Sequence, residues 1–119
     1  MDEKILYRTP IINSWGAVTL VNHCGLITPE KRWCVISLDK DSRPIYPEDV
    51  TPGNLKSFIV VTRRTGDPTP TKEEVMFCEA WRKAAEDAGS TLVDYIIMCG
   101  AHHYSFADEQ VHGPGKIGF

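Results

Sequence analysis

The chain has 119 residues and a formal net charge of −3, which is enough length for one hydrophobic core and excludes two domains. Its 42% hydrophobic and 24% charged residues are typical of soluble globular domains, and its apolar runs are too short to span a bilayer. The negative balance disfavours general binding to a phosphate backbone. Because the charged start of the chain lacks the apolar region of a signal peptide, we expect a cytoplasmic protein with no membrane contact.

The first half of the chain predicts one helix followed by an edge hairpin. Ser14 is the expected N-cap of the helix, and Gly25 is its expected stop. Residues 33–38 form an apolar run typical of a buried strand, and a turn-rich segment follows them. Ile45 and Tyr46 are expected to begin an antiparallel strand, which the nearby prolines confine to the edge of the sheet.

A long helix from Thr71 to Ala88 is the firmest local feature. Thr71 as N-cap and Glu74 three residues later match a capping box, in which each side chain accepts a hydrogen bond from the other residue's amide. Gly89 provides the stop. The face expected to pack on the sheet carries Val75, Cys78, Ala85 and Ala88, with Phe77, Trp81 and Ala84 beside it.

Strands are expected on either side of this helix and near the end of the chain. Residues 57–62 and 92–99 are apolar, strand-like runs, and residues 104–106 begin a last short strand. We expect residues 1–112 to form the domain. Residues 113–119 contain three glycines and one proline and are expected to form a flexible C-terminal tail.

The segment 61–74, with the sequence VTRRTGDPTPTKEE, resembles the active-site loop of the RadC-like group of the JAB/MPN metalloprotease-like superfamily. In that family a His-x-His-Pro-Ser segment leads into Gly-Asp-Pro-Thr-Pro-Ser, and an aspartate follows in the next helical turn. The two histidine positions fall here on Val61 and Arg63, the proline on Arg64, the serine on Thr65 and the aspartate on Glu74.

The resemblance extends in order over residues 14–108. Residues 30–39 are similar to the family's first long strand, residues 48–55 to its acidic segment before Gly-Thr-Leu, and residues 92–100 to its Leu-Leu-Asp-His-Ile-Ile strand. A second family helix is missing before Phe58. The resemblance implies an α/β (α+β) single domain, a minimised RadC/JAB-like fold: a mixed sheet of about five strands with one long helix packed on it. The missing helix is expected to leave one sheet face uncovered, to be buried by a partner or by homodimer formation.

The family site implies zinc chemistry that this chain has lost. Two imidazoles and a carboxylate hold zinc, and a glutamate activates the bound water. Glu48 matches the position of that glutamate, Thr65 that of an oxyanion-stabilising hydroxyl, and Glu74 that of the carboxylate ligand. Val61 cannot coordinate zinc, and Arg63 would repel it. We therefore predict a pseudoenzyme with no catalytic residues, no metal and no cofactor.

Two groups of side chains are candidates for binding. Arg63 and Arg64 either recognise an acidic partner or phosphate, or form a solvated pair neutralised by Asp67 and Glu73 or Glu74. His102, His103 and Tyr104 are expected in a turn at the sheet edge, where they would serve an interface. Because His102 and His103 are adjacent, they would face opposite sides of a strand and could not chelate a metal together.

The sequence thus predicts a non-catalytic protein-binding module. RadC-like proteins are common on phages and plasmids, so the resemblance implies a mobile genetic element, and we expect an inhibitor of a host defence system of the anti-CRISPR type. Its partner would be a nucleic-acid-binding host protein. The alternatives are a zinc metallohydrolase or isopeptidase of the JAB family, a DNA-repair-related module that binds nucleic acid through Arg63, Arg64 and the Arg82–Lys83 pair, and a folding remnant or dimerising subunit.

Overall fold

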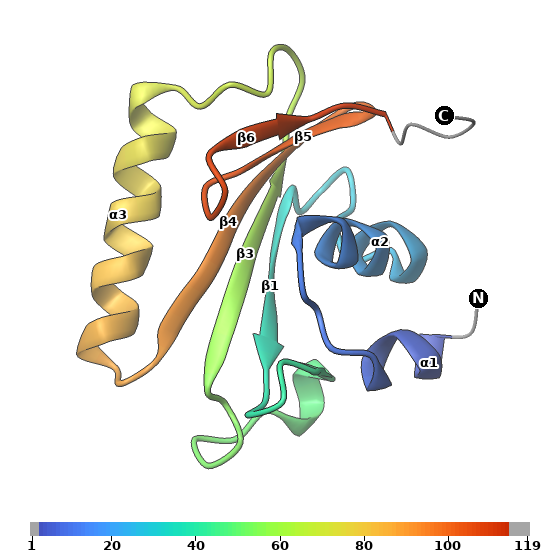
Figure 1. Ribbon diagram of the computed structural model, residues 1–119, viewed down its shortest axis with the longest axis vertical. Coiled ribbons are helices and arrows are strands. Elements are labelled where there is room, and N and C mark those ends of the chain that lie inside the picture. Colours follow the sequence, from blue (N-terminus) through green and yellow to red (C-terminus); the bar gives the residue numbers. More distant parts are fainter. Residues whose placement is uncertain (1–2, 115–119) are drawn as a thin grey trace.

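The computed structural model describes residues 3–114, in which a six-stranded mixed sheet lies between two helical layers (Figure 1). The strand order is β2-β1-β3-β4-β5-β6. The elements are α1 (Glu3–Arg8), α2 (Ser14–Cys24), β1 (Trp33–Leu38), β2 (Pro44–Ile45), a 3₁₀ turn η1 (Pro47–Asp49), β3 (Ser57–Arg63), α3 (Lys72–Asp87), β4 (Thr91–Cys99), β5 (His102–Ser105) and β6 (Gln110–His112).

The connections follow from the pairing directions. β3 and β4 are parallel, and α3 provides the crossover between them; the other neighbouring strands are antiparallel. The expected α+β fold with a long helix on a mixed sheet is confirmed, although the sheet has six strands rather than about five. β6 and α1 were not expected, because short segments beside a glycine-rich or charged stretch carry little periodicity. Residues 115–119 of the expected tail lie outside the described residues.

Helix α2 is capped one residue earlier than expected. The Asn13 side chain accepts a hydrogen bond from the Gly16 amide at 3.2 Å, so Asn13 is the N-cap, and Ser14 is the first helical residue. The Ser14 hydroxyl is instead buried and shares a hydrogen bond with His103. Gly25 ends the helix as predicted, with a φ of 62° in the left-handed region that glycine adopts without strain.

The larger core lies between the sheet and helices α1 and α2. The strand positions on this face alternate with those on the other face, as the period of two requires. Val61 is completely buried here, so the branched residue at the first histidine position is part of the core. The buried members are Tyr7, Ala17, Val18, Leu20, Val21, Ile27, Cys34, Ile36, Leu38, Ile59, Val61, Ile96 and Met98.

The smaller core lies under α3. It consists of Phe58, Val60, Cys78, Ala85, Tyr95, Ile97 and Cys99. The capping box is confirmed: the Glu74 amide donates to Thr71 Oγ1 at 3.2 Å, and the Thr71 amide donates to Glu74 Oε1 at 2.9 Å.

The expected buried face of α3 is partly wrong. Only Cys78 and Ala85 are buried, whereas Val75 is 45% and Phe77 is 55% exposed, and Ala88 is exposed at the helix end. The contacts of α3 are mainly with β4, so the helix touches the sheet along a narrow line. Its wider apolar stripe therefore extends past the sheet it was expected to cover.

The prediction of an uncovered sheet face also needs correction. Figure 1 shows α3 on one side of the sheet and α1 and α2 on the other, so neither face is bare. The part without a helix is the α3 side of β1. There Trp33 is 44% exposed and Val35 is 37% exposed, although both belong to a strand next to the centre of the sheet.

Candidate functional site

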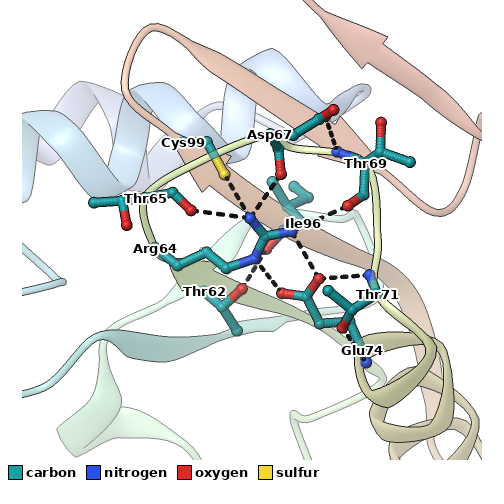
Figure 2. A network of polar contacts seen from close by, with 9 residues as sticks. All are labelled: Thr62, Arg64, Thr65, Asp67, Thr69, Thr71, Glu74, Ile96 and Cys99. Carbon is teal, nitrogen blue, oxygen red and sulfur yellow. Dashed lines mark hydrogen bonds and ion pairs between the residues drawn. The ribbon is translucent and has the colours of Figure 1, made fainter.

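The loop that joins β3 to α3 is built around the guanidinium group of Arg64 (Figure 2). Arg64 Nε donates to Glu74 Oε2 at 2.6 Å, and Nη2 donates to Glu74 Oε1 at 2.8 Å. The pair is bidentate, which is the strong geometry for an arginine–carboxylate contact. It joins the end of β3 to the first turn of α3.

The remaining donors of Arg64 bind carbonyl groups of the loop itself. Nη1 donates to Thr65 O at 3.1 Å and to Asp67 O at 2.7 Å, and Nη2 donates to Thr69 O at 3.1 Å. A guanidinium has five N–H donors, and these contacts use all of them. The loop can wrap around the group because Gly66 has a φ of 95°, a conformation that other residues rarely adopt.

The charges of this loop neutralise one another. The hydrogen bonds from Arg64 hold the pKa of Glu74 below its usual value, and the same contact raises the pKa of Arg64. Asp67 Oδ1 accepts a hydrogen bond from the Thr69 amide at 2.8 Å, which lowers the pKa of the Asp67 carboxyl. The Arg64–Glu74 pair is partly buried, with 27% and 14% of the two side chains exposed. Arg64 is thus an internal cation without a spare donor.

The positions that match the zinc ligands are separated by the sheet. Val61 and Arg63 face the α2 side, where Arg63 Nη2 donates to Asn22 Oδ1 at 3.0 Å, whereas Glu74 lies with Arg64 at the start of α3. Among residues 3–114, no three His, Cys, Asp or Glu side chains are placed to hold a metal ion. A single carboxylate already bonded to arginine does not fit a zinc site, which needs at least three protein ligands.

The structure does not bring Glu48 to the other two remnant positions. Glu48 is exposed on η1, which follows β2 at the end of the sheet where β3 begins. Thr65 and Glu74 lie beyond the other end of β3. The seven residues of β3 span about 23 Å at the usual rise per residue. Glu48, Thr65 and Glu74 therefore do not form one site.

The candidate binding residues His102, His103 and Tyr104 lie in strand β5, between β4 and β6, so the expected turn at the sheet edge is wrong. Their side chains face different surroundings. His103 is 1% exposed, and its Nε2 shares a hydrogen bond of 2.8 Å with Ser14 Oγ. Its ring stacks on His112 at 4.8 Å, and burial lowers the pKa of His103 to about 4, so the imidazole is neutral near pH 7. His102 is exposed on the opposite side of the strand, and Tyr104 is half-buried against Phe106. His103 is thus a core residue, and the exposed group of this trio is His102.

The basic residues named for nucleic-acid binding do not converge. Arg63 contacts α2 on one side of the sheet. Arg82 lies on α3 on the other side, where it pairs with Glu79. Arg64 between them is fully engaged within its loop.

Asp94 is a polar residue of the core that the sequence analysis did not single out. It is 7% exposed and accepts hydrogen bonds from the Tyr95 amide at 2.8 Å, the Ser105 hydroxyl at 2.6 Å and the Ala107 amide at 2.9 Å. Burial raises the pKa of this carboxyl. The signal for it was an aspartate inside the apolar run of β4. Its role is to hold β5 and the turn after it against β4.

Sequence reasoning expected an uncovered sheet face, but it missed the exposed apolar surface that α3 and β1 form together. The Trp33 and Trp81 rings lie 6.2 Å apart, Val35 is next to Trp33 on the same face of β1, and Phe77 and Trp81 line one shallow hollow on α3. We call these four residues the α3–β1 surface. The signal was the width of the apolar stripe on α3, which exceeds what one strand pair can cover.

The fold and this loop define an α+β domain in which a guanidinium-centred loop links a parallel strand pair through one long helix. No protein-family model matches the chain. The chain is similar to UPF0758 proteins, the RadC/MPN group: it is 26% identical over 127 residues to one from Rhodobacter capsulatus, covering 89% of this chain and 59% of that protein.

Two other proteins that are similar to this chain are also UPF0758 proteins. A UPF0758 protein from Thermotoga maritima is 36% identical over 74 residues, which is 58% of this chain and 33% of the relative. One from Ruegeria pomeroyi is 26% identical over 130 residues, which is 92% of this chain and 58% of the relative. The chain therefore spans less than two thirds of the length of these relatives. The comparisons support the RadC-like resemblance at low identity.

The helices can also be compared with the requirements for a membrane-spanning segment. None of the helices between residues 3 and 114 has both the length and the apolar composition needed to cross a bilayer.

Proposed function

We propose that this chain is a RadC-like domain that has lost catalysis and works as a protein-binding module. The similarity to UPF0758 proteins supports the RadC-like part of the proposal. The donor set at the loop supports the loss of zinc chemistry, because the positions of the ligands carry Val61, Arg63 and an arginine-bonded Glu74.

The α3–β1 surface is the observation that carries the binding role. Trp81 connects its two parts, because its ring lies 6.2 Å from that of Trp33 and it lines a hollow with Phe77. Phe77 is 55% exposed, and Trp33 is 44% exposed. Contiguous exposed apolar side chains of this kind are typical of sites that bind another protein. Large aromatic residues are also the side chains that contribute most to the affinity of protein interfaces. The surface therefore suits an apolar partner.

The finer part of the proposal concerns the partner. The RadC-like resemblance implies a mobile genetic element, and the net charge of −3 is compatible with a basic, nucleic-acid-binding host protein. We propose an inhibitor of a host defence system of the anti-CRISPR type. Co-expression with an active CRISPR system is expected to restore transformation by a targeted plasmid. Unchanged plasmid loss across the CRISPR types tested removes this finer part and leaves the binding role standing.

Affinity capture with matched variants tests the binding role. The full chain, Phe77→Ser and Ile12→Ser serve as baits in a lysate of the source organism; Ile12 is 87% exposed and lies outside the α3–β1 surface. The wild-type and I12S baits are expected to retain the same protein, and F77S to retain at least tenfold less, because a buried interface phenylalanine contributes about 1.4 kcal/mol or more. Equal capture by F77S and I12S would contradict the proposed surface.

Metal analysis tests the loss of catalysis. Purified protein supplied with zinc is expected to retain far less than one zinc per chain, since the positions that match the zinc ligands carry one carboxylate and no imidazole. Stoichiometric zinc together with cleavage of an isopeptide substrate would overturn the non-catalytic part of the proposal.

A further inference from the structure

The outer edge of β1 is open along more than half of its length. β2 pairs only with Ser37 and Leu38, so residues 33–36 have no neighbouring strand on that side within the described part of the chain. An open strand edge presents unpaired amide and carbonyl groups, and proteins normally cover such edges or block them with charge, proline or a bulge. Residues 33–36, with the sequence WCVI, carry none of these blocking residues.

The pairing with β3 fixes which backbone groups face outward. The Arg63 amide donates to the Arg32 carbonyl at 2.9 Å, so the backbone of Arg32 faces β3. In an antiparallel ladder the direction alternates from residue to residue. The amide and carbonyl groups of Trp33 and Val35 therefore point away from β3, toward the open edge.

A groove runs along this edge. It has a volume of about 290 Å³ and receives residues from both faces of β1: Trp33 and Val35 from the α3 side, and Cys34 and Ile36 from the α1 and α2 side. A hollow bordered by both faces lies beside the strand itself, where an added strand would lie. Its other lining residues are Tyr7, Leu26, Lys31, Ile45 and Pro47.

The residues that line the groove indicate which side chains a bound segment would carry. Lys31 is the charged residue among the lining residues, and its ammonium lies 5.0 Å from the centre of the Trp33 ring. The other lining residues are apolar or aromatic. An occupant with apolar side chains and one carboxylate near Lys31 matches this lining, because the carboxylate would pair with the ammonium at the rim.

A second folded copy of the chain fits this edge poorly. Antiparallel self-pairing centred on Cys34 would place Trp33 of each copy opposite Val35 of the other. Each copy carries β2 on the same edge, directly after the free residues. The β2 of one copy would then meet the residues just before β1 of the other. A flexible segment has no such obstruction.

We propose that the β1 edge binds an extended segment of a partner protein as an added strand, with apolar side chains at alternate positions and an aspartate or glutamate beside Lys31. The proposal rests on the protein-binding role and names the partner's chemistry. In strand addition the main-chain hydrogen bonds supply affinity, and the pockets for alternate side chains supply specificity. The Trp33 side chain belongs to both the groove and the α3–β1 surface, so one partner can cover the two.

The test selects random linear heptapeptides displayed on phage against the full chain and measures the enriched peptides by fluorescence anisotropy. Enriched peptides are expected to alternate apolar and polar residues and to carry an acidic residue. Val35→Pro removes an outward amide, which an edge strand tolerates, and is expected to weaken binding at least tenfold. Val35→Thr keeps the amide and the branched shape and is expected to bind within about threefold of wild type. Circular dichroism is the control that checks whether both variants fold.

A charge reversal at Lys31 provides a third variant. Lys31 is exposed, so Lys31→Glu is expected to leave the fold intact. It should lower the affinity for the acidic peptides about fivefold, and a repeated selection should then enrich basic peptides. The edge site is overturned if V35P binds the peptides as well as V35T, or if the selection enriches no alternating pattern. Continued capture of the cellular partner in that case leaves the protein-binding role intact, whereas failure of the capture experiment removes that role independently.

Discussion

The two faces of the sheet differ in how completely they are covered. On one face α1 and α2 close a deep core whose central residues, such as Leu20, Val61 and Ile96, are at most 1% exposed. On the other face α3 touches the sheet along a line of Cys78 and Ala85 and leaves Phe77 and Trp33 half-exposed. Burial of apolar area stabilises a fold, and exposure of it costs solubility. The first face therefore contributes most to the stability of the fold. The second face keeps apolar side chains exposed, where another molecule could bury them.

The largest expected effect lies in the α1 and α2 core. Leu20→Ala should lower the free energy of unfolding by about 2–5 kcal/mol, because it removes buried methyl groups and leaves a cavity. Urea unfolding followed by tryptophan fluorescence measures the change. A loss below about 1 kcal/mol would show that this face is loosely packed and would remove the contrast between the faces.

Acid should weaken the same face through His103. Its folded pKa of about 4 lies below the ordinary 6.5, so the unfolded chain binds more protons between these values. Stability is therefore complete above about pH 6.5 and falls by about 3 kcal/mol as the pH drops to about 4. His103→Gln should lose this dependence. Asp94 acts in the opposite direction, since its raised pKa lets the folded state hold the proton.

The comparison of wild type with H103Q isolates the histidine. Glu74 and Asp67 have lowered pKa values, so their contributions are lost only at more acid pH, when these carboxylates take up protons. Both proteins carry these carboxylates, and the difference between their unfolding curves from pH 7 to pH 4.5 reports on His103. Parallel curves over that range would contradict the assignment of a neutral, buried imidazole.

Removal of Arg64 should have a moderate effect on the start of α3. Arg64→Ala leaves the partly buried Glu74 carboxylate and three loop carbonyls without their donor, at a cost of about 2 kcal/mol. Hydrogen exchange of residues 64–75 is expected to rise, while that of the α2 segment stays unchanged. Arg82→Ala, on the exposed side of the same helix, is the matched control and should change stability by less than about 0.5 kcal/mol.

The smallest stability effect is expected on the exposed face. Phe77→Ala should change the free energy of unfolding by less than about 1 kcal/mol, because most of this side chain already contacts water. The same urea unfolding assay that measures L20A gives this value. A loss as large as that of L20A would mean that Phe77 stabilises the fold and would weaken its assignment to a binding surface.

Local features of the sequence predicted the fold well. The Thr71–Glu74 capping box, the run Trp33–Leu38 and the left-handed Gly25 depend on neighbouring residues, so they are visible in the sequence. The exposure of Phe77 depends on which strands lie beneath α3, and periodicity carries no such information. Of the two interpretations of Arg64, its pairing with Glu74 matches the neutralised pair.

The candidate site was harder to assemble from the sequence. The order of motifs along the chain matched Glu48 and Thr65 to two positions of the same family active site. Motif order, however, does not specify which end of the sheet a segment occupies. Likewise, the adjacency of His102 and His103 correctly predicted opposite faces, whereas the burial of His103 depends on Ser14, which is 89 residues away. Contacts at such separations follow from the completed fold alone.

The guanidinium of Arg64 has a consequence for how this end of the domain behaves in a cell. A loop held by a bound ion is ordered only while that ion is supplied, and it opens when a chelator competes for it. Arg64 is covalently part of the chain, so its charge cannot exchange, and its hydrogen bonds to Glu74 and to three carbonyls form as soon as the chain folds. A change in the supply of metal ions in a cell therefore removes none of the described contacts that Arg64 makes at the β3–α3 junction.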